Sequence, residues 1–287
     1  MNSFRNTAQV SFPLPPAGSP WPSPDIRESL FASLAGRTFT LEVTACQAGL
    51  FSGTSRLREK AESLGLELDR LAPEGAPIGK GAQVCRAHAS AWQAANAEEL
   101  FLGCIGKASG VATAAAAFVA MAVGEARVVC GAWKKVAPEG RPDLRHAIRT
   151  GGAGTRITDQ PFVYLDKNYV RMLGGVAPAV RRARLIPGRV VVVQIRGEAA
   201  PITTEARDAS REGAGILMVD TGRIEDLVAV RDIAGREEFR TRIPVAFGGG
   251  VNFGNFRDVL DAGADIVDVG RAIIDAPLLD FRLDVVG

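Results

Sequence analysis

The sequence predicts an α/β fold in which parallel strands alternate with helices and form a barrel or a doubly wound sheet. A continuous β-branched run at residues 190–195 is typical of a strand covered on both faces. Further apolar strands are expected at 216–220, 243–247 and 265–269, with helical segments between them. Strands that recur about every 25 residues with intervening helices indicate parallel pairing.

Length and composition fit one large globular domain or two smaller ones. The chain has 287 residues, of which 47% are hydrophobic and 23% charged, which excludes disordered, collagen-like and coiled-coil classes. The formal net charge of +2 offers no bulk polycation for binding nucleic acid. Four cysteines form no C-x-x-C pair and only two histidines are present. We therefore expect reduced core thiols and no histidine-rich metal site.

The N-terminal part is expected to combine short strands with one helix. Residues 1–24 contain six prolines, so we expect an extended arm rather than regular structure. The alternating or apolar segments at 39–43, 66–68 and 81–84 predict short strands, and residues 55–64 predict a helix.

A long helix is predicted after Asn96, because Glu99 follows three positions later in the capping-box pattern. Gly124 ends this helix. Its apolar run at 111–123 has thirteen residues, whereas a membrane span needs about twenty, so we expect a buried helix. The N-terminus also lacks the apolar core of a secretory signal, and we expect a cytoplasmic protein.

Two neighbouring strand ends carry glycines that predict a phosphate site. Gly248, Gly249 and Gly250 end one strand before a helix, and Gly270 and Arg271 end the next strand. Such corners expose backbone N–H groups, a helix N-terminus adds partial positive charge, and Arg271 adds a full charge. Barrels build phosphate sites after their late strands. The alternative is that the glycines only permit tight turns.

Charged residues at the other strand ends are further candidates. Asp220 is the last residue of its strand and can hold Mg²⁺ or ribose hydroxyls, or cap the next helix. Lys134 and Lys135 follow an apolar stretch, Lys167 lies further along, and Arg156 ends a glycine-rich loop. These cations can bind phosphate or carboxylate as point charges, or can be solvated surface residues.

These motifs resemble the nicotinate-nucleotide pyrophosphorylase (quinolinate phosphoribosyltransferase) family over about residues 25–287. The most specific match is residues 108–113, Ala-Ser-Gly-Val-Ala-Thr, which resembles the family's Ser-Gly-Ile-Ala-Thr helix motif. Residues 48–53 resemble its early glycine-rich turn, and residues 133–138 fall where the family has Thr-Arg-Lys-Thr-Thr-Pro. Residues 247–251 follow one of its closing strands.

The resemblance implies an N-terminal α/β sandwich over residues 25–125 and an open α/β barrel with parallel strands over residues 126–274. Residues 275–287 are expected to return to the sandwich. It further implies a homodimer or larger homo-oligomer, in which the N-terminal domain of one subunit covers the barrel mouth of another. The implied reaction transfers phosphoribose from phosphoribosyl pyrophosphate, with Mg²⁺, to a nitrogen heterocycle or related small acceptor. The expected partner is thus a small phosphorylated substrate, with no nucleic acid and no membrane.

The site residues follow from the resemblance together with the strand-end pattern. The expected catalytic residues are Lys135, Asp220 and Lys167, with Asp220 also holding the metal. The expected substrate-binding residues are Lys134, Arg156, Glu99, Gln194, Asp166 and Asn168. The expected phosphate-binding residues are Gly248, Gly249, Gly250, Gly270 and Arg271.

The acceptor side departs from the family. Two of the family's cationic positions fall at Glu99 and Asp166, and a family glutamate falls at Gln194. Each misplaced charge about 4 Å from a carboxylate is worth roughly 4 kcal/mol at an effective dielectric near 20. We therefore expect an altered acceptor pocket that does not bind pyridine-2,3-dicarboxylate tightly. A slip of one residue would restore Lys167 for Asp166, and Glu99 can instead face away as the partner of Asn96.

Two other functions stay open. A different phospho-substrate barrel enzyme, such as a lyase, isomerase or decarboxylase, would use the same glycine corners, with Asp166 and Lys167 transferring protons. A catalytically silent, ligand-binding paralogue would also explain the lost charges.

Overall fold

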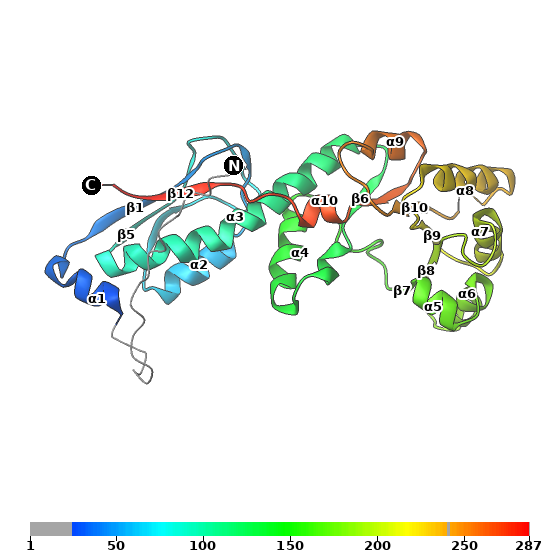
Figure 1. Cartoon of the computed structure of the whole chain (residues 1–287), viewed down its shortest axis with the longest axis horizontal. Helices are drawn as coiled ribbons and strands as arrows, with labels where there is room; N and C mark the ends of the chain where they lie inside the picture. Colours follow the sequence, from blue (N-terminus) through cyan, green and yellow to red (C-terminus); the bar gives the residue numbers. More distant parts are fainter. Residues whose placement is uncertain (1–24, 240–241, 287) are drawn as a thin grey trace, which may run out of the picture.

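The computed structural model describes residues 25–239 and 242–286 of the chain (Figure 1). The proline-rich arm predicted at residues 1–24 lies outside the described residues. The described chain folds into an antiparallel sheet followed by a larger parallel sheet surrounded by helices. The predicted α/β class is confirmed.

The N-terminal part is a four-stranded antiparallel sheet with helices packed on it. Its strand order is β12-β1-β5-β3, so the last strand of the chain crosses back to lie beside the first (Figure 1). The burial of β1 alternates, as in a strand with one face on a core. The elements are α1 (Ile26–Leu30), a 3₁₀ turn (Ala32–Leu34), β1 (Phe39–Ala45), β2 (Gly49–Leu50), α2 (Thr54–Ser63), β3 (Leu68–Leu71), β4 (Pro77–Ile78), β5 (Gln83–Ala89) and β12 (Phe281–Val286).

One long helix, α3 (Ala91–Met121), contributes to both parts of the molecule. Phe101 in its first half joins the core under the antiparallel sheet, and Phe118 in its second half joins the core of the barrel. The segment before β12 packs against Gly110, where a Cβ would lie 2.0 Å from the Pro277 carbonyl oxygen. By length and composition α3 could cross a membrane, but half of its most apolar window is buried inside the protein. The prediction of a buried helix is confirmed.

The predicted start of this helix is wrong. Ser90 caps α3: its hydroxyl accepts from the backbone of Gln93 (3.3 Å), and the Gln93 side chain accepts from the Ser90 backbone (2.9 Å). Asn96 and Glu99 lie inside the helix, and the Asn96 side chain donates to the Trp92 carbonyl at 2.7 Å. The sequence holds two overlapping cap patterns, and the tertiary fold selects the earlier one.

The C-terminal part is a six-stranded sheet in the order β6-β11-β10-β9-β8-β7, with every neighbouring pair parallel. This order leaves β6 and β7 at the two ends, and the open seam between them receives Gly154, which bridges to Val129 of β6. The strands are β6 (Arg127–Val129), β7 (Phe162–Leu165), β8 (Val190–Ile195), β9 (Ile216–Val219), β10 (Val245–Gly248) and β11 (Ile266–Asp268). The expected open parallel barrel is confirmed.

Helices cover the outside of this sheet (Figure 1). They are α4 (Arg141–Thr150), α5 (Lys167–Met172), α6 (Val176–Arg184), α7 (Ile202–Arg211), α8 (Ile224–Arg236), α9 (Phe256–Asp261) and α10 (Arg271–Ile274), with 3₁₀ turns η2 (Ala132–Lys135) and η3 (Pro138–Gly140). Val192 and Met218 point into the barrel, whereas Val193 and Leu217 pack beneath the helices. Burial on both faces explains why these strands read as continuous apolar runs.

All four cysteines are free. Burial raises the pKa of both Cys85 and Cys130 to about 12, so these two thiols stay protonated at neutral pH.

Candidate active site

A cavity of about 710 Å³ opens where the parallel strands end. Each of the six strands, or the loop that follows it, contributes to the wall, which is the position that parallel barrels reserve for ligands. Its lining includes Gly131, Lys134, Lys135, Tyr164, Gln194, Asp220, Gly249, Gly250, Asp268, Gly270 and Arg271.

The glycine corner after β10 is shaped by backbone that only glycine adopts readily. Gly249 and Gly250 have φ angles of +99° and +87°. A Cβ on Gly249 would lie 2.7 Å from the backbone nitrogen of Gly222, so the two loops pack backbone to backbone. The parallel pairing of Gly248 with Asp268 directs the Gly249 N–H to the Asp268 backbone carbonyl, whereas among the described residues no acceptor receives the N–H groups of Gly250 or Gly270. These donors are therefore open to an anion in the cavity.

The helices beside the two corners differ. The helix expected at residues 253–262 begins at Phe256, and a turn held by Asn252 and Asn255 separates its N-terminus from Gly250. Helix α10 does start immediately after Gly270. Its first residue, Arg271, is 84% exposed and pairs with Asp275 at 2.9 Å.

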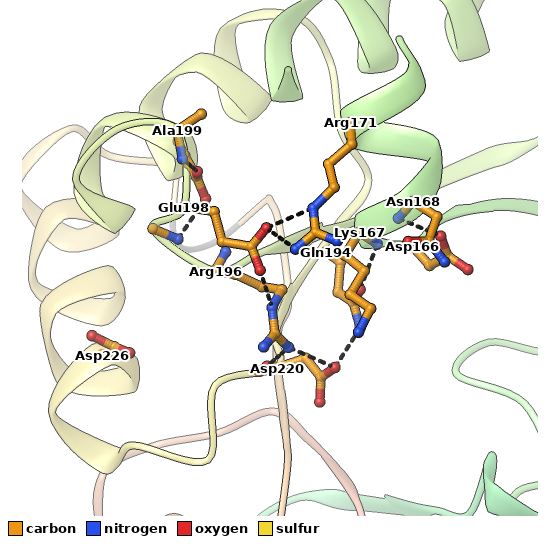
Figure 2. Close-up of polar contacts among 12 residues, drawn as sticks. Asp166, Lys167, Asn168, Arg171, Gln194, Arg196, Glu198, Ala199, Asp220 and Asp226 are labelled. Atoms are coloured by element: carbon orange, nitrogen blue, oxygen red, sulfur yellow. Dashed lines mark hydrogen bonds and ion pairs between the residues drawn. The ribbon is translucent and has the colours of Figure 1, made fainter. Parts of the chain in front are cut away.

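Asp220 is held by two neighbours (Figure 2). Gln194 donates to the Asp220 carboxylate (2.5 Å) and accepts from the Lys167 backbone (2.7 Å). The Arg196 guanidinium contacts the backbone carbonyl of Asp220 and lies 3.2 Å from its carboxylate. Glu198 orients Arg196 in turn, at 2.9 Å. Asp220 thus caps no helix in this structure: α8 has no side-chain cap.

The environment of Asp220 shifts the pKa of its carboxyl upward in spite of the nearby cations. Burial raises the pKa of Asp220 above its usual value, although Arg196, Lys134, Lys135 and Lys167 all act in the opposite direction. A carboxyl group with a raised pKa in a cavity is a candidate functional group.

Sequence reasoning missed two groups in the same cavity, the carboxyl of Asp268 and the phenol of Tyr164. Asp268 ends β11, and its Oδ1 accepts from the Gly131 backbone at 2.9 Å. Burial raises the pKa of Asp268, and the hydrogen bond from Gly131 and the charge of Asp220 act in opposite directions on it. Burial, followed by the charge of Asp268, raises the pKa of Tyr164. Like Asp220, Asp268 is a carboxylate at the end of a strand, so the same sequence signal could have found it.

The lysines of η2 face the cavity. Lys134 and Lys135 both line it, and the Lys134 ammonium lies 6.0 Å from the centre of the Tyr164 ring. Both side chains come from exposed residues at the rim, so they can meet a ligand without a burial penalty of their own.

The other predicted site residues lie elsewhere. Asp166 caps α5, because its Oδ1 accepts from the backbones of Asn168 (2.8 Å) and Tyr169 (3.1 Å), and it does not line the main cavity. Lys167 lines a smaller neighbouring hollow, and Glu99 is exposed on α3. Arg156, with its neighbour Thr155, lines a chamber in the barrel seam.

The residues present fit a magnesium ion brought in with a phosphorylated substrate better than a resident ion. No group of three or more His, Cys, Asp or Glu side chains is gathered in the part of the chain that the structure describes. Asp220 and Asp268 nevertheless offer carboxylate oxygens to one cavity. Mg²⁺ commonly takes one or two carboxylates and completes its shell with water and substrate phosphates.

Two successive parts of the sequence match the two domains of one protein family. Residues 26–109 match the quinolinate phosphoribosyl transferase N-terminal domain, and residues 111–284 match its C-terminal domain. A rat protein named nicotinate-nucleotide pyrophosphorylase [carboxylating] is 26% identical over 96% of this chain and 93% of its own. The human protein of the same name is 28% identical over 74% of this chain and 70% of its own.

Solved structures share the fold. A nicotinate-nucleotide pyrophosphorylase from Francisella tularensis has a TM-score of 0.76 at 21% identity and covers 91% of this chain and 94% of its own. The one from Ehrlichia chaffeensis has a TM-score of 0.78 at 17% identity, over 90% and 92% of the two chains.

Proposed function

The chain belongs to the quinolinate phosphoribosyltransferase family, and on that premise we propose that it transfers phosphoribose from phosphoribosyl pyrophosphate to a small nitrogen heterocycle in an altered acceptor pocket. The observation that carries the proposal is the pairing of open glycine corners with a rim of two lysines and a floor of two carboxylates in one cavity. Phosphates and a cationic ribose centre need these opposite charges a few ångströms apart.

The phosphate end uses backbone donors and rim cations. The free N–H groups of Gly250 and Gly270 would bind phosphoryl oxygens beside the turn that Gly249 shapes, and Arg271 and Lys135 would add positive charge. Bound Mg²⁺ would neutralise charge on the pyrophosphate that departs.

The reaction joins the ring nitrogen of the acceptor to C1 of the ribose. The nitrogen lone pair forms the new bond as the bond between C1 and the pyrophosphate oxygen breaks, and the electron pair of that bond leaves with pyrophosphate. Positive charge develops at the sugar ring in such a step. A carboxylate fixed beside the ribose, as Asp220 is by Gln194 and Arg196, would stabilise this charge in a site of low dielectric.

The altered acceptor pocket rests on Gln194, which the sequence indicated, and on Asp268, which it did not. Glu99 and Asp166 do not line the cavity, whereas Gln194 and the unpredicted Asp268 do. In its ionised form, the Asp268 carboxyl disfavours a second carboxylate on the acceptor. The family's substrate named above, pyridine-2,3-dicarboxylate, is therefore expected to react poorly.

Calorimetric titration with phosphoribosyl pyrophosphate and Mg²⁺ tests the phosphate end. We expect Gly249→Ala to weaken binding at least tenfold, because the new Cβ meets the Gly222 backbone. Gly124→Ala is the matched control: its φ is also positive (+77°), but its Cβ would have nothing within 4 Å. Absence of binding to the wild-type chain, or equal losses in the two variants, would contradict the proposal.

Turnover is tested separately by pyrophosphate release with a panel of heterocycles. Rapid release with pyridine-2,3-dicarboxylate would refute the altered pocket while leaving the transferase intact. Tight binding of phosphoribosyl pyrophosphate without release with any heterocycle would identify a ligand-binding paralogue instead.

A further inference from the structure

A separate cavity lies where the N-terminal part of the chain meets the barrel, and we call it the junction cavity. Its volume is about 520 Å³, which is within the usual size range of ligand pockets. Helices α2 and α3 line one side of it, and α4, α10 and the segment that joins η2 to η3 line the other (Figure 1). None of its described lining residues also lines the main cavity, so the two are separate spaces.

The side chains that line the junction cavity are mainly cationic where they are charged. Arg56 and Lys60 come from α2, and Lys107 comes from α3. The one carboxylate of the described lining, Asp143, is already paired with Arg56 at 2.8 Å. No carboxylate in the described parts of the chain pairs with Lys60, and the Lys107 ammonium donates to the Ala276 carbonyl at 2.7 Å. Both lysines therefore keep N–H donors for an anion.

A cysteine in this cavity adds no opposing charge. Cys104 is half-buried among the lining residues. Burial raises the pKa of the Cys104 thiol above its usual value, although the charge of Lys60 acts in the opposite direction. The thiol is therefore protonated at neutral pH, and three cations with one carboxylate leave the described lining with a net charge of +2.

The rest of the lining is mostly apolar. Leu144 and Ala147 of α4, Ile274 of α10 and Val136 contribute to it, and the side chains of Ala147 and Ile274 are buried. On the side of α3, Gly103 leaves open space, because a Cβ there would have nothing within 4 Å. Apolar surface beside uncommitted cations favours a ligand that has both an apolar body and an anionic group.

We propose that the junction cavity is a second ligand site, which takes a small organic anion with one carboxylate and an apolar body. The two carboxylate oxygens accept from Lys60 and Lys107 in charge-assisted hydrogen bonds. The apolar body packs against the side chains of Leu144 and Ile274 and is removed from water there. This inference goes beyond the proposed function and does not depend on it, since none of these residues takes part in phosphoribosyl transfer.

Three probes separate the two features of such a ligand. The compound 3-phenylpropanoate has both the apolar body and the carboxylate, 3-phenylpropanamide keeps the body without the charge, and inorganic phosphate keeps negative charge without the body. Each is titrated calorimetrically into the full chain in the absence of phosphoribosyl pyrophosphate. A hydrogen bond to a charged group changes an equilibrium by roughly 10- to 100-fold. We therefore expect 3-phenylpropanoate to bind at least about tenfold more tightly than either of the other probes.

A change of charge assigns the carboxylate to the lysines. Lys60→Met removes one cation but keeps an unbranched apolar side chain, so it should weaken 3-phenylpropanoate at least about tenfold and change the amide by less than about threefold. Lys80→Met is the matched control, because Lys80 is exposed and does not line the junction cavity. It should leave the affinities for both probes unchanged.

A change of volume assigns the binding to the cavity itself. Gly103→Leu places a side chain in the open space and should weaken both organic probes at least about tenfold, because it excludes the apolar body. Gly235→Leu in α8 is the matched control: its Cβ would also have nothing within 4 Å, and Gly235 does not line the cavity. Unfolding temperatures of the four variants establish that they fold.

Several results would overturn the inference. They are absence of 3-phenylpropanoate binding to the wild-type chain, an amide or phosphate that binds as tightly, and binding that survives Gly103→Leu in a folded variant. Displacement of 3-phenylpropanoate by phosphoribosyl pyrophosphate and Mg²⁺ would place it in the main cavity instead. Sedimentation of Gly103→Leu covers one more case, because loss of binding together with a changed assembly mass would assign the cavity to a contact between chains. Failure of phosphoribosyl pyrophosphate itself to bind would contradict the proposed function and leave this inference intact.

Discussion

Glu74 ties the N-terminal part of the chain to the barrel, and its removal should cost much of the stability. Its carboxylate accepts from the Ser52 hydroxyl (2.6 Å), the backbones of Gly53 (3.0 Å) and Thr54 (2.9 Å), and the Thr150 hydroxyl (2.8 Å). Thr54 begins α2, whose N-cap residue Gly53 has no side chain, and Thr150 ends α4. Glu74 thus supplies the missing cap of α2 and joins it to α4.

The magnitude is worked from these four hydrogen bonds, beside which His146 Nε2 also lies 3.1 Å from the carboxylate. Loss of a helix cap costs about 0.5–2 kcal/mol, and each further hydrogen bond to a charged group contributes about 1.5–3 kcal/mol. We expect Glu74→Ala to lower the free energy of unfolding by about 3–5 kcal/mol, since the contacts overlap and the site is only half-buried. Glu74→Gln keeps the shape but loses the charge, and should cost about 1–2 kcal/mol.

The pH dependence of urea unfolding provides the assay. Burial alone would raise the pKa of Glu74, but the hydrogen bonds from Ser52, Thr150, Thr54 and Gly53 outweigh it and hold the pKa below its usual value. A lowered folded-state pKa stabilises above the unfolded-state pKa, and this contribution is lost as pH falls through the folded-state pKa. The difference between wild type and Glu74→Gln should be full at pH 7 and shrink below about pH 4. A loss under about 1 kcal/mol in Glu74→Ala, or a Gln difference independent of pH, would refute the reasoning.

Two other substitutions probe packing and function. Gly110→Ala places a Cβ 2.0 Å from the Pro277 carbonyl oxygen and should lower the free energy of unfolding by about 2 kcal/mol or more, measured by thermal or urea unfolding. Gly103→Ala in the same helix, whose Cβ would have nothing within 4 Å, should raise it by about 0.5–1 kcal/mol. Equal effects of the two substitutions would show that the contact with Pro277 is unimportant. Burial raises the folded-state pKa of Asp220, so ionisation of this carboxyl opposes folding as pH rises through that pKa. Asp220→Asn should therefore unfold at no lower temperature than wild type at pH 7. Its rate of pyrophosphate release should fall at least about 100-fold. A variant with a lower unfolding temperature and unchanged release would show that Asp220 is structural.

Local pattern was a good guide where one short segment decides the outcome. The runs that form β8, β9 and β10 are apolar because both faces of the sheet are covered, and this property is written in consecutive residues. The glycines at 249 and 250 indicate a corner for the same reason, since their positive φ angles are a local demand on residue type. Burial of the apolar second half of α3 follows likewise from its composition.

Local pattern failed where two segments compete or where distance decides. The Asn96 and Ser90 caps are equally plausible in sequence, and packing of α3 on the sheet settles the choice. Asp166 was expected in the acceptor pocket; its Oδ1 caps the start of α5, and Asp166 does not line the main cavity. Asp268 and Gly131 are far apart in sequence, so their hydrogen bond and the pocket they border were invisible until β11 and β6 lay side by side.

The sequence by itself determined the alternating architecture, the family and the glycine corners, because periodicity, apolar runs and backbone demands act over a few residues. Only the tertiary structure decided which charges meet. Asp220 is paired by Arg196, Asp268 lies against Gly131, and Glu99 is turned to the surface. Electrostatic interaction depends on separation in space and on burial, and neither quantity can be read from the order of residues along a chain.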